Sequence, residues 1–109
     1  MIPTSNLGAM LLQTARRLPD RPGLIWRDKV WSWAEIAARA SSAAAGLQAR
    51  GIGAGDRVLI HSRNNNAIFE GVWAVWLIGA VWVPTNFRLS PPEAAYLAGS
   101  SRCKAQIFD

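Results

Sequence analysis

Two stretches of the chain contain the residue types that bind phosphate groups in other proteins. Gly51, Gly53 and Gly55 alternate as in a dinucleotide-binding loop, and Gly99 and Lys104 have the spacing of a P-loop. A dinucleotide loop follows a strand and opens a helix, whereas these three glycines follow a predicted helix and open a predicted strand. The second stretch lacks the second Gly and the hydroxyl residue after Lys104. We therefore interpret both stretches as turns.

Nucleophiles, bases and metal ligands are scarce in this sequence. It has one histidine, His61, and one cysteine, Cys103, so it can form neither an internal disulfide nor a Cys-His or multi-His metal site. His61 could act as a general base, but it ends an apolar segment with no nucleophile nearby in sequence, which favours a structural role. Cys103 is interpreted as a small packed side chain. We predict no catalytic residue and no metal ligand.

The positive charge of the chain is spread along the sequence. Twelve Lys and Arg residues against seven Asp and Glu give a formal charge of +5. The arginines occur singly or in pairs, without a basic run or the aromatic interleaving of a nucleic-acid module. This pattern favours a solvated basic surface, and we expect no nucleic-acid partner.

One uncharged segment, residues 71–84 (GVWAVWLIGAVWVP), has the composition of a membrane span. It is shorter than the about 20 residues that a spanning helix needs, and Gly79 interrupts it. Residues 1–10 show no basic region followed by an apolar core. We expect no transmembrane segment and no secretory signal, and a lone cysteine fits a reducing cytoplasm.

The periodicity of apolar residues predicts the elements that would position these side chains. The expected order is helix, hairpin, helix, strand, helix, strand, helix, strand, over residues 7–18, 24–31, 32–51, 58–60, 66–79, 81–83, 90–99 and 105–108. Strands that alternate with crossover helices predict an α/β fold with a parallel sheet covered on both faces. The alanines of the second helix suggest that it packs closely against a sheet.

Local signals mark where several of these helices begin and end. Ser32 with Glu35, and Ser90 with Glu93, have the spacing of a capping box, and an Asn in the run 64–66 can cap the third helix. Gly51 can end the second helix in a left-handed conformation.

Three motifs occur in a specific order along the chain. They are WSWAEI at residues 31–36, GIGAGDRV at 51–58 and GAVWVPTNFRLSP at 79–91. Together they resemble the N-terminal part of AMP-forming acyl-CoA synthetases, a superfamily that includes amino-acid adenylation domains and luciferases. The resemblance runs from about residue 7 to residue 109. Thr85 and Phe87 depart from the residues that are commoner in the family.

The resemblance implies a fold and a reaction for a longer parent protein. The fold would be the N-terminal subdomain of the acyl-adenylate-forming ligases, a partial parallel or mixed sheet with covering helices. Residues 1–109 would form an incomplete part of the AMP-binding large domain. The parent would convert a carboxylic acid, ATP and CoA to acyl-CoA, AMP and pyrophosphate. The Asn86-x-Arg88-Leu89 form resembles fatty-acyl or aryl-CoA ligases more than amino-acid adenylation domains.

The residues that carry out this chemistry in the family are not found here. The Ser/Thr-Gly-rich Pro-Lys loop, the acidic metal and ribose ligands and the C-terminal catalytic lysine have no match. We therefore expect the chain alone to be inactive and to bind no cofactor, with ATP, Mg²⁺ and CoA bound by the parent.

One residue is carried over as a site residue, and one partner is expected. By the resemblance, Arg88 would contact a phosphate of CoA, although a solvated loop arginine is an equal alternative. Six Trp residues and an uncovered last strand suggest that the rest of the synthetase chain packs here. The alternative from another class is a stand-alone α/β module that binds a partner through exposed tryptophans.

Overall fold

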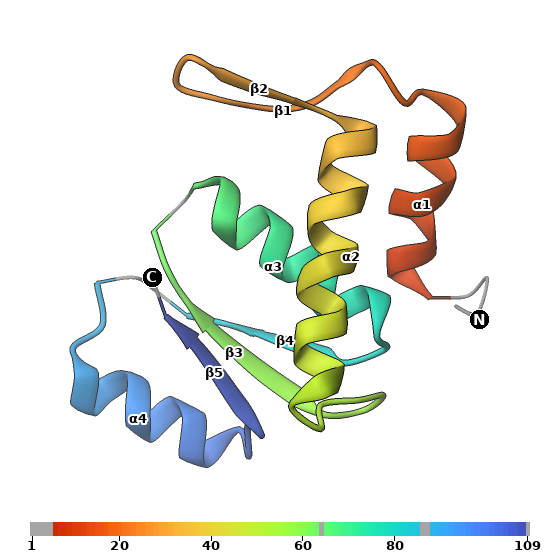
Figure 1. Ribbon diagram of the computed structural model, residues 1–109. Helices are drawn as coiled ribbons and strands as arrows, with labels where there is room; N and C mark the ends of the chain where they lie inside the picture. The colour runs from red at the N-terminus through yellow and green to blue at the C-terminus, as the bar shows by residue number, and fades with distance from the viewer. Residues whose placement is uncertain (1–5, 64, 86–87, 109) are drawn as a thin grey trace.

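The computed structural model describes residues 6–63, 65–85 and 88–108. The predictions for Asn64, Asn86 and Phe87 lie outside these ranges. The elements follow the predicted order (Figure 1): α1 Leu7–Arg17, β1 Pro22–Trp26, β2 Lys29–Ser32, α2 Trp33–Ala49, β3 Arg57–His61, α3 Asn66–Leu77, β4 Val81–Pro84, α4 Pro91–Ser100 and β5 Ala105–Phe108.

Three strands form the parallel sheet that the sequence predicts. Their order is β4-β3-β5, with Val58 opposite Trp82 on one side and opposite Ala105 on the other. Figure 1 shows α2 and α3 on one side of this sheet and α4 on the other. β1 and β2 pair antiparallel as a separate ribbon beside α2. The α/β fold with a partial parallel sheet and covering helices is confirmed.

Each predicted helix start has a hydrogen-bonded cap. Ser32 Oγ accepts from the Glu35 amide at 3.1 Å, and the Glu35 carboxylate accepts from the Ser32 amide at 3.3 Å. Ser90 and Glu93 form the same capping box on α4. The Asn65 side chain accepts from the Ile68 amide at 3.0 Å and caps α3. These bonds satisfy amides that have no partner within the helix.

The core lies between the helices and the sheet, with fully buried side chains from Leu11, Ile36, Val58, Ile60 and Val75. The alanine-rich face of α2 was expected to pack against a sheet, and its buried Ala40 and Ala44 belong to one core cluster with Val58 and Ile60 of β3. α2 lies chiefly against α3 and also against α1, while α3 contacts β3 and β4. Alanine side chains are small, so they allow either a helix or a sheet to approach the helix closely.

α1 approaches the end of α3 at a glycine. A Cβ atom added to Gly8 would lie 2.6 Å from the Cα atom of Leu77 and 2.9 Å from the carbonyl carbon of Trp76. Both neighbours are backbone atoms, which cannot rotate away. Gly8 therefore allows the two helices to touch backbone to backbone.

Candidate functional site

The carboxyl ends of β3 and β4 form the edge where ligands bind in open parallel α/β sheets. His61 ends β3, and Thr85 follows β4 directly. The Nδ1 atom of His61 lies 2.8 Å from Thr85 Oγ1, and this hydroxyl also lies 3.2 Å from the Ile60 carbonyl. The single proton of the hydroxyl goes to the carbonyl, so Nδ1–H of His61 donates to Thr85. The contact joins the ends of two neighbouring strands, which supports the structural interpretation of His61.

Thr85 is the residue at this edge that the sequence analysis missed. It was noted only as a departure from the commoner residue of the motif. Its position one residue beyond β4, beside the end of the parallel strand β3, is what brings its hydroxyl to His61. The predicted parallel sheet offered only a general signal, because the carboxyl ends of parallel strands lie at the same edge.

Arg88 lies in the loop that leads from β4 to α4, and its side chain is exposed. The loop starts at the same edge of the sheet as His61 and Thr85. A guanidinium in this position can reach an anion in solvent, since it has five donors and a permanent charge. Its contact with a CoA phosphate remains a prediction.

The two stretches with phosphate-binding residue types meet at the opposite edge, beside the amino ends of the strands. Asp56 accepts from the Gly53 amide at 2.8 Å and from Lys104 Nζ at 3.2 Å. Lys104 Nζ also donates to the Gly51 carbonyl at 2.7 Å. The Gly53 amide, followed by the Lys104 ammonium, lowers the pKa of Asp56. The lysine and the glycine-rich turn thus bind each other, in agreement with their interpretation as turns.

An aromatic row crosses from α3 to β4. Phe69 and Trp73 have ring centroids 6.3 Å apart, Trp73 and Trp76 5.3 Å apart, and Trp76 and Trp82 6.2 Å apart. All three pairs are edge-to-face, an arrangement that aromatic rings favour. The row lines an open groove of about 240 Å³, the aromatic groove, formed by Ile68, Phe69, Val72, Trp73, Trp76 and Trp82.

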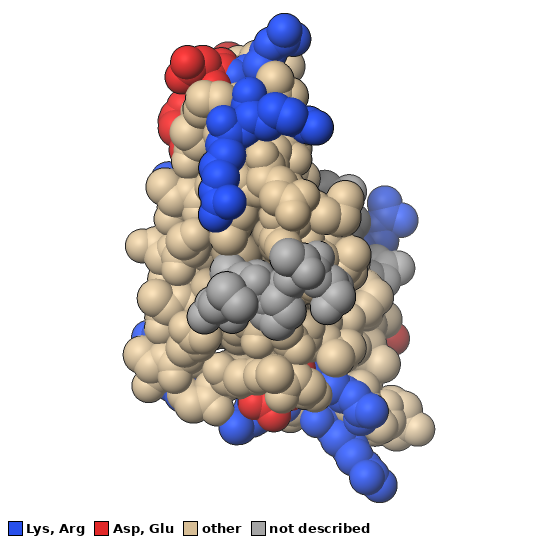
Figure 2. Space-filling model, turned by 90° about the vertical axis from the view of Figure 1, so that its right-hand side faces the viewer, with Lys and Arg blue, Asp and Glu red and all other residues tan. Residues whose placement is uncertain are grey.

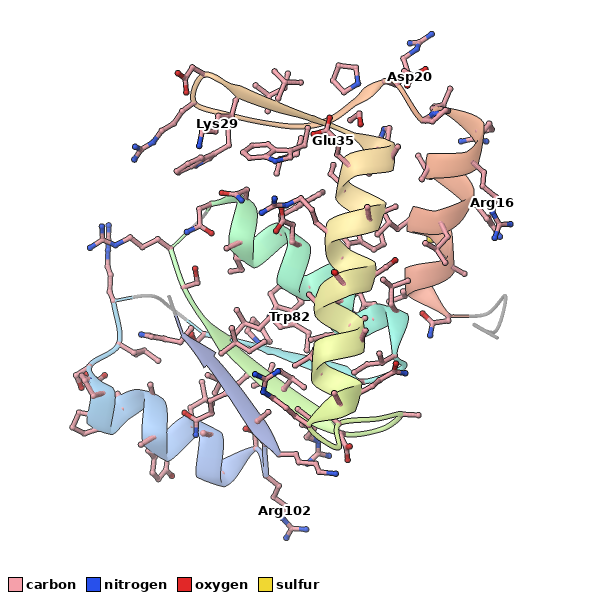
Figure 3. The ribbon with its side chains drawn as sticks, viewed as in Figure 1. Arg16, Asp20, Lys29, Glu35, Trp82 and Arg102 are labelled. Carbon is pink, nitrogen blue, oxygen red and sulfur yellow. The ribbon has the colours of Figure 1, made fainter. Side chains whose placement is uncertain are left out.

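The charged side chains do not gather into a single surface. In the view of Figure 2, Lys and Arg lie at the top, at the bottom and at the right-hand side of the molecule. Figure 3 shows Arg16 pointing outward from α1 and Arg102 at the far end, next to β5. Among the residues with described placement, no three His, Cys, Asp or Glu side chains form a group that could hold a metal ion. Within those same ranges no helix is long and apolar enough to cross a membrane.

Comparisons with known proteins point to one family. The sequence model of the family described as AMP-binding enzyme matches residues 11–109. Feruloyl-CoA synthase of Amycolatopsis sp is 35% identical over 102 residues, which cover 94% of this chain and 21% of that protein. The long-chain-fatty-acid–CoA ligase of Thermus thermophilus is 40% identical over 78 residues, covering 72% of this chain and 14% of that protein.

A solved structure superimposes on nearly the whole fold. This structure is the N-terminal subdomain of Klebsiella oxytoca NpsA in complex with 3-hydroxyanthranilyl-AMSN, and its sequence is 26% identical to this chain. The superposition has a TM-score of 0.89 and covers 95% of this chain and 27% of the NpsA chain. The chain spans about a fifth of the length of the first curated relatives that it matches.

Proposed function

Because this chain belongs to the AMP-binding enzyme family, we propose that it is the N-terminal part of the large domain of an ATP-dependent acyl-CoA synthetase. The synthetase joins a carboxylic acid to CoA and converts ATP to AMP and pyrophosphate. The observation that carries the proposal is the family match over residues 11–109, together with relatives whose names describe CoA ligases.

Aryl or fatty acids are the proposed substrates. Relatives named for ferulate, 3-hydroxybenzoate and long-chain fatty acids support this range. The Asn86-x-Arg88-Leu89 motif supports it as well. The relatives also include a linear gramicidin synthase subunit. The proposal that the substrate is an acid joined to CoA, and not an amino acid, therefore rests on the Asn86-x-Arg88-Leu89 motif.

Within the synthetase, the proposed role of this segment is to build part of the sheet and not to perform catalysis. ATP phosphates need free amides and a cation, but Gly53 and Lys104 already bind Asp56. Among the described residues no three His, Cys, Asp or Glu side chains form a group that could hold a metal ion. The contacts to ATP and Mg²⁺ are therefore proposed to come from the remaining part of the synthetase. Arg88 fits a phosphate of CoA, to which its guanidinium would supply charge-assisted hydrogen bonds.

The first experiment measures carboxylate-dependent exchange between ATP and pyrophosphate by the purified 109-residue chain. We expect no exchange above background. The chain then replaces the matching segment of feruloyl-CoA synthase of Amycolatopsis sp, and formation of feruloyl-CoA is measured. We expect this chimera to be active. Exchange by the isolated chain, or a folded chimera without activity, contradicts the proposal.

The role of Arg88 is tested in the same chimera. Removing one charge-assisted hydrogen bond is expected to raise the KM for CoA about tenfold in Arg88→Ala, with partial recovery in Arg88→Lys. Arg102→Ala is the matched control, because Arg102 is an exposed arginine next to β5, at the opposite edge of the sheet. Equal KM values for the Arg88→Ala and Arg102→Ala chimeras would assign Arg88 to the solvated surface.

A further inference from the structure

A second arginine, Arg63, lies at the same edge of the parallel sheet as Arg88. Arg63 follows β3, which ends at His61, and Arg88 follows β4, which ends at Pro84. Both arginine side chains are exposed. Figure 1 shows the loops after β3 and β4 leaving the sheet at the same end, on the left of the view. Two permanent positive charges therefore extend from neighbouring strands at one edge.

Hydrogen bonds hold the starts of these two loops in place. His61 at the end of β3 contacts Thr85 just beyond β4, with 2.8 Å between Nδ1 and Oγ1. Ser62 is 8% exposed, and its hydroxyl donates to the Arg63 carbonyl at 2.9 Å. Neighbouring strands in a sheet lie about 4.8 Å apart, so the two loops start close together. Long side chains from both loops can therefore reach one anion.

Neither loop contributes a carboxylate to this edge. Residues 62–65 (SRNN) and 85–90 (TNFRLS) contain no Asp or Glu. On the helices that follow, Glu70 pairs with Arg39, and Glu93 belongs to the capping box of α4. Because α3 and α4 begin at this edge, the partial positive charges of two helix N-termini add to those of the arginines. The edge therefore has the charge that attracts an anion.

The two positive charges match a phosphate monoester better than a carboxylate. A monoester carries a charge of about −1.5 to −2 at pH 7 and has three acceptor oxygens. A guanidinium binds two oxygens at once, so two guanidiniums can share the three oxygens of one phosphate. CoA carries such a monoester on its ribose. The phosphates of ATP are partly neutralised by Mg²⁺, whereas the monoester of CoA depends on protein cations.

We propose that Arg63 is a second phosphate-binding residue and forms, with Arg88, a two-arginine clamp on the 3′-phosphate monoester of CoA. The clamp makes the synthetase prefer CoA to thiols that lack this phosphate. This assignment rests on the proposed function, because CoA is a substrate of the proposed synthetase.

The test compares CoA with dephospho-CoA, which keeps the diphosphate and the thiol but lacks the 3′-phosphate, in the feruloyl-CoA synthase chimera. In Arg63→Ala the KM for CoA should rise about tenfold, the effect of one charge-assisted hydrogen bond, with partial recovery in Arg63→Lys. The KM for dephospho-CoA should change less than about twofold, because the lost contact is to the missing phosphate. Arg102→Ala, at the opposite edge, is the matched control and should alter neither KM.

A double variant tests whether both arginines act on the same phosphate. The preference of the chimera for CoA over dephospho-CoA is measured as the ratio of the two kcat/KM values. This preference should fall in Arg63→Ala and in Arg88→Ala and disappear when both substitutions are combined. Added salt should reduce the preference of the unsubstituted chimera and leave the double variant unaffected, because salt screens exposed charges.

Binding without turnover provides an independent readout. Adenosine 3′,5′-bisphosphate, the nucleotide end of CoA, is titrated into the ¹⁵N-labelled chimera, or into the 109-residue chain if the chimera does not fold. The Nε–H signals of Arg63 and Arg88, assigned with their alanine variants, should shift, whereas the Arg102 signal should not. Adenosine 5′-monophosphate, which lacks the 3′-phosphate, should bind about tenfold more weakly.

Several results would overturn the clamp. Equal KM values for CoA in the Arg63→Ala and Arg102→Ala chimeras, or an Arg63 signal that does not move in the titration, would assign Arg63 to the solvated surface. An equal rise in the KM for CoA and for dephospho-CoA would identify the diphosphate as the bound group. A rise in the KM for ATP alone would identify ATP as the ligand.

Failure of the clamp and failure of the proposed function can be distinguished. A chimera that forms feruloyl-CoA but shows no effect of Arg63→Ala refutes the clamp alone. A folded chimera that forms no feruloyl-CoA, but whose Arg63 signal shifts with the bisphosphate, refutes the proposed function alone.

Discussion

Replacing Gly8 by Ala should destabilise the protein although alanine favours helices. The new Cβ atom would lie 2.6 Å from the Leu77 Cα atom and 2.7 Å from the Leu77 amide nitrogen, so α1 and α3 must separate. Overpacking of this kind costs about 1–3 kcal/mol, and the change from Gly to Ala in a helix returns up to about 1 kcal/mol. Subtracting that gain leaves an expected net loss of up to about 2 kcal/mol in the free energy of unfolding.

Urea denaturation followed by circular dichroism measures this loss, and thermal unfolding should show a Tm lowered by about 4–8 °C per kcal/mol. Gly46→Ala in α2 is the matched control. The nearest heavy atom to its added Cβ is Arg50 Nη1 at 3.6 Å, at the flexible end of a side chain. This control should gain about 0.5–1 kcal/mol. If Gly8→Ala were as stable as Gly46→Ala, the close approach of α1 to α3 would be refuted.

Three further predictions concern caps and charges. Ser32→Ala removes the cap of α2 and should cost about 1 kcal/mol in urea unfolding, with no such loss for an exposed serine outside a cap. Asp56 has a folded pKa below its ordinary value of 3.8, so its stabilising effect is present above that pH and is lost as the pH falls through the folded pKa. The difference in urea midpoint between the native protein and Asp56→Asn should therefore be largest at neutral pH and disappear in strong acid; a constant difference would exclude the Asp56–Lys104 pair as its cause. Arg39 of α2 and Glu70 of α3 form an ion pair, and the Arg39 side chain is 52% exposed. A double-mutant cycle should therefore give a coupling energy of about 0.3–1 kcal/mol, and this energy should decrease in 1 M salt.

Features specified by a few neighbouring residues were predicted well from the sequence. The capping boxes at Ser32 and Ser90 place both donor and acceptor within three residues, so the local sequence contains the whole interaction. The last strand was predicted at residues 105–108 and is found there, because a turn and an apolar run define it.

The parallel sheet was predicted, but individual contacts between side chains far apart in sequence were not. Asp56 and Lys104 are 48 residues apart, and only the pairing of β3 with β5 brings them together. The contact of His61 with Thr85 likewise needs the register of β3 and β4. The neighbour of α2 could not be read from its alanines, since a small-residue face is compatible with either a helix or a sheet.

Arg88 illustrates a different limit. Its role was taken from a resemblance, and its exposure in the loop after β4 is compatible both with a phosphate contact and with solvation. The Nε1–H group of Trp82 is buried and has no hydrogen-bond acceptor among the described residues. Only the structure reveals this, because the burial of a single atom leaves no pattern in the sequence.

The order β4-β3-β5 has a consequence for synthesis on the ribosome. β3 can pair with β4 as soon as Pro84 is available, but its other side has no partner until β5 has been made. At about 5–20 residues per second, the stretch between these two strands takes on the order of a few seconds to translate. During that interval the nascent chain presents the unpaired backbone of an apolar strand, which is a site where chaperones bind or neighbouring chains aggregate. The speed of translation between residues 84 and 108 therefore determines how long this hazard lasts.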